Sequence, residues 1–183
     1  MTKEQALNIN FLKANAKKIH FFGLGFIQIK IDDFHRVHVY TDKFPSTTME
    51  EEIHNHRYQF NSAILKGTLT QKIYSVRDDR DGHYLLTKEV CNPEIEKKEH
   101  HATSCDVTLT QVHHFAAGTV YWTAANTFHQ VESKNAVTFI TRGGYEKSEA
   151  DVVYHHSKTT TCPFSIKVSE EKLWEIVEEV LRD

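Results

Sequence analysis

Histidine is the residue type in this chain that most clearly indicates a chemical function, with 13 copies among 183 residues. Two of them, His54 and His56, form a His-x-His pair in a strand-like segment. In a strand, residues two apart point to the same face with Cα atoms about 6.6–6.8 Å apart, so two imidazoles can converge on one metal at about 2.0–2.1 Å. The pair therefore indicates a metal site, and a polar face turned to solvent is the alternative with the same spacing.

The residues around this pair resemble the first signature motif of the cupin superfamily, in which a His-x-His pair is followed by an acid and then a glycine. His54, His56 and Gly67 fall at the family's spacings. Phe60 stands at the place of the acid, and Thr48 stands at that of the leading glycine. The resemblance thus keeps both histidines of the motif and replaces its carboxylate with an apolar ring.

The second cupin motif is also matched in part. Gly118 and His129 are in register with it, whereas Ala124, Asn126 and Ser133 replace its proline, second glycine and asparagine. The resemblance implies an all-β core, the cupin double-stranded antiparallel β-barrel of jelly-roll type, with helices at both ends.

For chemistry, the resemblance implies a mononuclear metal centre with His54, His56 and His129 as its ligands. Without the glutamate, this set resembles the centre of the thiol dioxygenases, of which cysteine dioxygenase is the best-known member. Three neutral ligands would leave Fe(II) its full double charge and up to three open positions. A small anionic substrate, thiols included, and dioxygen would fit there.

Candidate substrate-binding residues follow from the alternation of side chains along a strand and from the same resemblance. Tyr58 shares the parity of the two histidines, which predicts that it faces the barrel interior. There it could hydrogen-bond a bound substrate or oxygen as a catalytic residue, or be a buried tyrosine with a structural partner. Cysteine dioxygenases hold the substrate carboxylate with an upstream arginine, for which Arg36 is the candidate, whereas Asn61 stands near the cysteine that some of them carry. Arg36 and His38 would line the substrate site if their strand turns that face inward, and would otherwise form a polar outer face. Arg142 is a second candidate for binding an anion.

Two further functions remain open at this stage. The same ligands could hold Zn, Mn or Ni as a Lewis acid in an isomerase, lyase or hydrolase. Alternatively, Phe60 could be an ordinary core residue of a cupin without a metal, and the barrel would then bind or sequester a nucleotide or a sugar.

The elements that must position these residues follow from local patterns, and one domain over 1–183 is expected. Thr2 and Gln5 form a capping-box pattern, and Ser169 precedes apolar residues at helical spacing. We predict an N-terminal helix (1–19), a β-barrel (20–145), a loop (146–168) and a C-terminal helix (169–183).

Within the barrel, short runs rich in β-branched and aromatic residues predict antiparallel strands. A hairpin is expected from 20–31 and 34–41, and a long strand segment from 53–76 with a tight turn or bulge at Gly67. The Asp81-Gly82 turn predicts another hairpin with 83–90. The polar segment 91–105 reads as an exposed loop.

Charge and composition narrow the partners. The formal net charge is −3, so nucleic acid is not an expected partner. No apolar run reaches the roughly 18 residues of a membrane span, and the N-terminus lacks a signal-peptide core. A cytoplasmic protein with a small-molecule substrate and no membrane partner is expected. A homodimer would be in keeping with cupin barrels, and three scattered cysteines favour reduced thiols.

Overall fold

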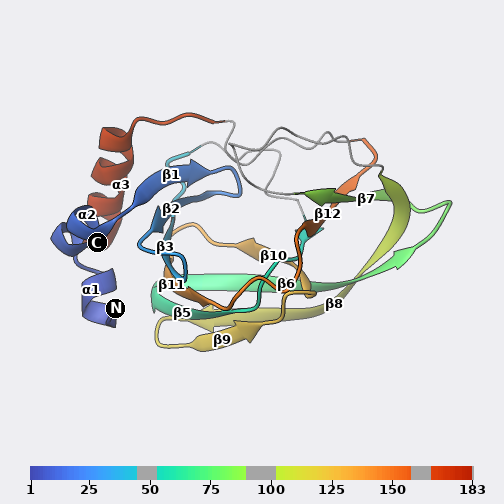
Figure 1. The fold of residues 1–183 in the computed structure, drawn as a ribbon, viewed down its shortest axis with the longest axis horizontal. Coiled ribbons are helices and arrows are strands. Elements are labelled where there is room, and N and C mark those ends of the chain that lie inside the picture. The colour runs from blue at the N-terminus through green and yellow to red at the C-terminus, as the bar shows by residue number, and fades with distance from the viewer. Residues whose placement is uncertain (45–52, 90–101, 158–165, 183) are drawn as a thin grey trace.

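The computed structural model describes residues 1–44, 53–89, 102–157 and 166–182, which fold mostly into β-structure (Figure 1). Two antiparallel six-stranded sheets form a barrel-like sandwich, which confirms the predicted all-β core. Short helices gather at one end, where both termini also lie (Figure 1). No helix in these ranges is long and apolar enough to cross a bilayer.

The helices are α1 (Lys3–Ala6), α2 (Ile9–Asn15) and α3 (Glu170–Arg182). The strands are β1 (Lys18–Phe22), β2 (Phe26–Lys30), β3 (His35–Tyr40), β4 (Ile53–His54), β5 (Phe60–Lys66), β6 (Thr68–Asp78), β7 (Tyr84–Glu89), β8 (Thr103–Ala116), β9 (Val120–Thr123), β10 (Phe128–Glu132), β11 (Val137–Arg142) and β12 (Ala150–His155).

The first sheet has the order β1-β2-β3-β11-β5-β9, and the second closes on itself in the order β10-β4-β12-β7-β8-β6. The chain passes from the first sheet to the second at Gly67, between β5 and β6. Gly67 has a φ of +73°, and a Cβ there would lie 2.3 Å from the Asn135 carbonyl oxygen. Only glycine fits this turn, which the sequence predicted.

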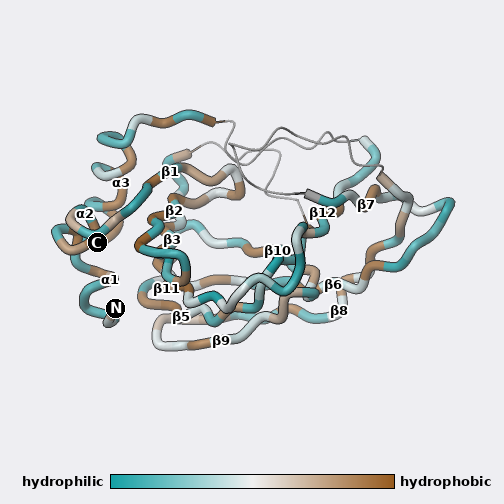
Figure 2. The backbone as a smooth tube through the Cα atoms, in the orientation of Figure 1, coloured by the Kyte–Doolittle hydropathy of each residue, from teal (hydrophilic) through white to brown (hydrophobic). Residues whose placement is uncertain are grey.

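The largest apolar core lies between the outer face of the first sheet and the helices. On α3, Leu173, Ile176 and Val177 are buried there, against strand residues that include Val37 and Val39. Burying each such side chain stabilises the fold by about 1.5–3 kcal/mol. Hydrophobic and hydrophilic residues alternate along the strands next to the helices, as Figure 2 shows.

The opposite face of the first sheet points into the sandwich. Tyr40 on β3 and Ile64 on β5 are buried in one cluster with Leu69 on β6 of the second sheet. Because side chains alternate along a strand, Arg36 and His38 share this inward face with Tyr40. The alternative of a polar outer face for β3 is therefore wrong.

The N-terminal region differs from the predicted single helix over 1–19. Thr2 caps α1 in the expected capping box with Gln5, but α1 ends at Ala6. Asn8 then accepts a hydrogen bond from the backbone N–H of Phe11 and starts α2. The side chain of Asn8 competes with helix continuation and splits the helix into two.

Residues 146–168 were predicted as a loop, yet β12 (Ala150–His155) lies within them and pairs with both β4 and β7. Strand-forming residues were present in this segment, including Val152 and Val153. The segment is short and adjoins charged residues, so its pattern was too weak to stand out.

The hairpin predicted from 53–76 and 83–90 is also wrong. The turn itself forms, with the Gly82 N–H donating to the Asp79 carbonyl. The strands on either side of it do not pair with each other, because both β6 and β7 pair with β8. Most of the predicted loop 91–105 lies outside the described residues, and its end, from Thr103, belongs to β8.

Two histidines on the inward face should make the fold sensitive to acid. Burial holds the pKa of His20 at about 4, and burial also holds the pKa of His38 well below its usual range. Both side chains take up a proton on unfolding below about pH 6.5, so the stability that they confer is lost as pH falls from there. For His20 this loss extends down to about pH 4.

Between pH 7.5 and pH 5 we expect the free energy of unfolding to fall less in His38→Gln than in wild type. Urea denaturation at the two pH values measures this difference. His83→Gln, at an exposed position, is the matched control and should leave it unchanged. If the free energy of unfolding depended on pH equally in wild type and in His38→Gln, His38 would not be a source of the acid sensitivity.

Candidate metal centre

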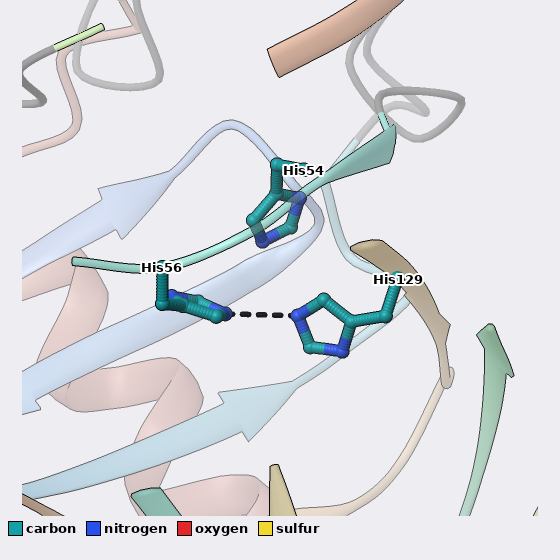
Figure 3. A group of neighbouring side chains, drawn as sticks. All are labelled: His54, His56 and His129. Carbon is teal, nitrogen blue, oxygen red and sulfur yellow. Dashed lines mark hydrogen bonds between the residues drawn. The ribbon is translucent and has the colours of Figure 1, made fainter. Parts of the chain in front are cut away.

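The three predicted ligands come together in space although His129 is far along the chain from the other two. His54 ends β4, His56 lies two residues beyond it, and His129 lies in β10 opposite His54. One ring nitrogen from each lies within 4.8 Å of the others. The three rings point toward one another in Figure 3.

The spacing of these nitrogens suits a metal ion. The Nε2 atoms of His56 and His129 lie 2.8 Å apart. Two nitrogens bound at right angles to one metal at 2.1 Å would lie about 3.0 Å apart. His54 completes the triangle, with its ring centroid 5.0 Å from that of each of the other two.

The electrostatics of the group also favour metal binding. Burial, together with the neighbouring histidines, holds the pKa of both His56 and His129 well below the usual range. These two side chains are therefore neutral at pH 7, and a neutral imidazole is the form that offers a lone pair to a metal.

Phe60 lies beside the histidines where the family's acid was expected. Its side chain is buried, and its ring centroid is 4.9 Å from that of His56 and 6.1 Å from that of His129. Within the described ranges, the group that could hold a metal consists of the three histidines alone. The donor set is thus neutral.

A polar network that the sequence did not predict anchors the His-x-His segment. Asn55, between the two histidines, is 2% exposed. Its amide donates to Asp151 Oδ2 at 2.7 Å and accepts from both the Asp151 N–H and Lys147 Nζ at 2.8 Å. Lys147 Nζ also lies 2.8 Å from Asp151 Oδ2. These contacts tie the histidine segment to β12.

A second residue that the sequence did not predict contacts His129 on the ring nitrogen that faces away from His56. Gln71 on β6 is 3% exposed, and its side-chain amide lies 2.7 Å from His129 Nδ1 and 3.2 Å from Thr123 Oγ1. Nothing in local sequence marks Gln71, because its partners are on β9 and β10.

Three of the four predicted substrate and catalytic residues gather beside His56. The Tyr58 ring lies 5.7 Å from the His56 ring, and Arg36 Nη1 donates to Tyr58 Oη at 2.8 Å. The Arg142 guanidinium lies 4.8 Å from the Tyr58 ring centroid. His38 lies farther along the inward face, where its ring contacts Gln28.

The two arginines keep unused hydrogen-bonding capacity although both are largely shielded from solvent. Arg142 is 7% exposed and donates from Nη1 to the Gly143 carbonyl. The Nε atoms of Arg36 and Arg142 are buried and have no hydrogen-bond partner among the described residues. Over the part of the chain that the structure describes, neither guanidinium forms an ion pair with a carboxylate.

Comparison with known proteins gives little independent information. No family model matches the chain, and no curated protein matches it. Among solved structures, the chain is similar to the hydroquinone 1,2-dioxygenase PnpCD, whose structure holds Cd²⁺ and 4-hydroxybenzonitrile. The identity is 11%, the TM-score is 0.35, and the match covers 80% of this chain and 77% of that one. This similarity is too weak to transfer an activity.

We expect Asn55→Leu to weaken Zn²⁺ binding at least tenfold, because the variant frees the segment that carries two ligands. It should also lower the free energy of unfolding by about 1–3 kcal/mol, since Asp151 and Lys147 lose buried partners. Competition with a chromophoric chelator and urea denaturation measure the two effects. Asn61→Leu, at an exposed position of β5, is the control. Zinc affinity equal to wild type in Asn55→Leu would show that the network does not position the ligands.

Proposed function

We propose that this chain is a mononuclear metal enzyme, an Fe(II) dioxygenase that acts on a small anionic substrate. The observation that carries the proposal is the convergence of His54, His56 and His129 next to two arginines, one buried and one half-buried, that have no carboxylate partner among the described residues. The resemblance to three-histidine cupins supports the same chemistry.

The histidines would hold the metal through three neutral nitrogens. Bound there, Fe(II) would keep its double charge and supply positions for an anionic substrate and for dioxygen. Phe60 fills the space beside His56 and His129 with an apolar ring. This side chain keeps a fourth protein ligand and its negative charge away from the centre.

Arg36 and Arg142 would bind the negative group of the substrate. A guanidinium carries five N–H donors in a fixed plane and suits a carboxylate or a phosphate. Arg36 uses one donor on Tyr58, and Arg142 uses one on the Gly143 carbonyl. The buried Nε donors remain available, and a bound anion would satisfy them.

Tyr58 would orient the reacting end of the substrate. Its oxygen accepts a hydrogen bond from Arg36, so its own proton is free to be donated elsewhere. The ring lies between His56 and the two arginines. From this place the hydroxyl could donate to a substrate that spans the metal and the anion site, which is the catalytic role we assign to it.

Metal analysis tests the centre itself. We expect untagged wild-type protein to hold close to one iron per chain by inductively coupled plasma mass spectrometry, and His54→Ala and His129→Ala to lose it. His83→Ala, at an exposed position, should retain it. Wild type that takes up no Fe(II) even under anaerobic reconstitution would refute the proposal. Stoichiometric Zn, Mn or Ni instead of iron, without oxygen uptake, would replace it with Lewis-acid chemistry.

Oxygen uptake tests the anion site separately. With small carboxylates, with and without a thiol, as substrates, we expect Arg142→Met to raise KM about 10- to 150-fold, because a hydrogen bond to a charged group contributes about 1.5–3 kcal/mol. Iron content should stay unchanged, and Arg77→Met, at an exposed position, should behave as wild type. An unaltered KM in Arg142→Met would remove this arginine from the substrate site.

A further inference from the structure

Gln71 is a buried side chain that contacts a candidate metal ligand, His129, at its second ring nitrogen. His129 turns Nε2 toward His56, as Figure 3 shows, and turns Nδ1 toward Gln71. The contact from the Gln71 amide to Nδ1 is 2.7 Å long. Gln71 therefore touches the part of the ring that determines where the proton of a neutral imidazole resides.

The proton position on His129 decides whether this residue can be a ligand. A neutral imidazole carries one N–H and one lone pair. If Nε2 is to offer its lone pair to a metal, the proton must be on Nδ1, and the neighbour of Nδ1 must accept a hydrogen bond. If the neighbour donates to Nδ1, the proton is on Nε2, where it is donated to His56 and blocks ligation.

A glutamine side chain can either accept a hydrogen bond from Nδ1 or donate one to it. A half-turn of the Gln71 amide exchanges its carbonyl oxygen for its nitrogen with almost no change of shape. The Thr123 hydroxyl, 3.2 Å away, can donate to the oxygen or accept from the nitrogen, so it supports both orientations. In the structure the nitrogen faces both Nδ1 and Thr123.

We infer that Gln71 is a positioning residue whose amide orientation selects the tautomer of His129, with the carbonyl toward Nδ1 in the metal-binding arrangement. The inference rests on the proposed three-histidine metal centre. A tautomer and an amide that disagree would place two donors against each other inside the protein. Such a mismatch leaves a buried donor without an acceptor, which is enough to shift metal affinity by about 10- to 100-fold.

Gln71→Glu and Gln71→Leu separate this role from packing alone. A carboxylate only accepts hydrogen bonds, so Gln71→Glu should hold the proton on Nδ1 and keep Zn²⁺ affinity equal to or tighter than wild type. Leucine has a similar shape and no acceptor, so Gln71→Leu should bind Zn²⁺ about 10- to 100-fold more weakly. Competition with a chromophoric chelator on the full-length protein gives both affinities.

The matched control is Gln130→Leu. Gln130 is the neighbour of His129 on β10, and its side chain bonds to Tyr74. Removing a buried amide there should leave Zn²⁺ affinity unchanged. Weakening by Gln130→Leu as large as that by Gln71→Leu would mean that loss of any buried amide in this sheet disturbs the site, and would overturn the inference.

Nitrogen NMR of His129 in protein without added metal gives a readout that does not depend on metal binding. The two ring nitrogens have distinct shifts according to which one carries the proton. We expect the Nδ1–H tautomer in Gln71→Glu and a different population in Gln71→Leu. Wild type that fails to bind metal would refute the proposed function and this inference with it, whereas identical tautomers in the two variants of a protein that binds metal would refute the role of Gln71 alone.

Discussion

The candidate centre depends on how a very short strand is held between two longer ones. β4 is only two residues long and lies between β10 and β12. Its pairing with β10 places His54 opposite His129. Asn55, the next residue, turns its amide to Asp151 on β12. Because neighbouring residues in an extended segment point to opposite sides, anchoring Asn55 on one side presents the histidines on the other.

The fold separates the part that stabilises it from the part that can do chemistry. One apolar core joins the helices to the outer face of the first sheet, and another fills the closed second sheet around Ile53, Cys105 and Val153. Cys105 is buried, and burial raises the pKa of its thiol to about 11, so this cysteine is a packing residue. With stability supplied largely by these cores, the space between the sheets can hold imidazoles and guanidiniums beside the apolar cluster of Tyr40, Ile64 and Leu69.

The features that the sequence predicts depend mainly on residues close together in the chain, whereas the features that it misses depend on residues far apart. The turn at Gly67, the amphipathic pattern of α3 and the spacing of the histidines are local or family patterns, and each has its counterpart in the structure. The pairing of β7 with β8, the anchor of Asn55 on Asp151 and the contact of Gln71 with His129 join residues far apart in sequence. Such partners are fixed by strand order, which no local pattern encodes.

Phe60 connects the proposed metal centre with the proposed anionic substrate through charge. In metal cupins with a glutamate, one protein charge offsets part of the charge of a divalent ion. Here the ring of Phe60 packs against His56 instead, and Arg36 and Arg142 add positive charge nearby without described carboxylate partners. Excess positive charge in a partly desolvated space is costly unless it is paired. A neutral substrate would leave that cost in place, whereas an anionic one would remove it on binding. Phe60 and the two arginines therefore favour the same substrate class for the proposed centre, a small anion.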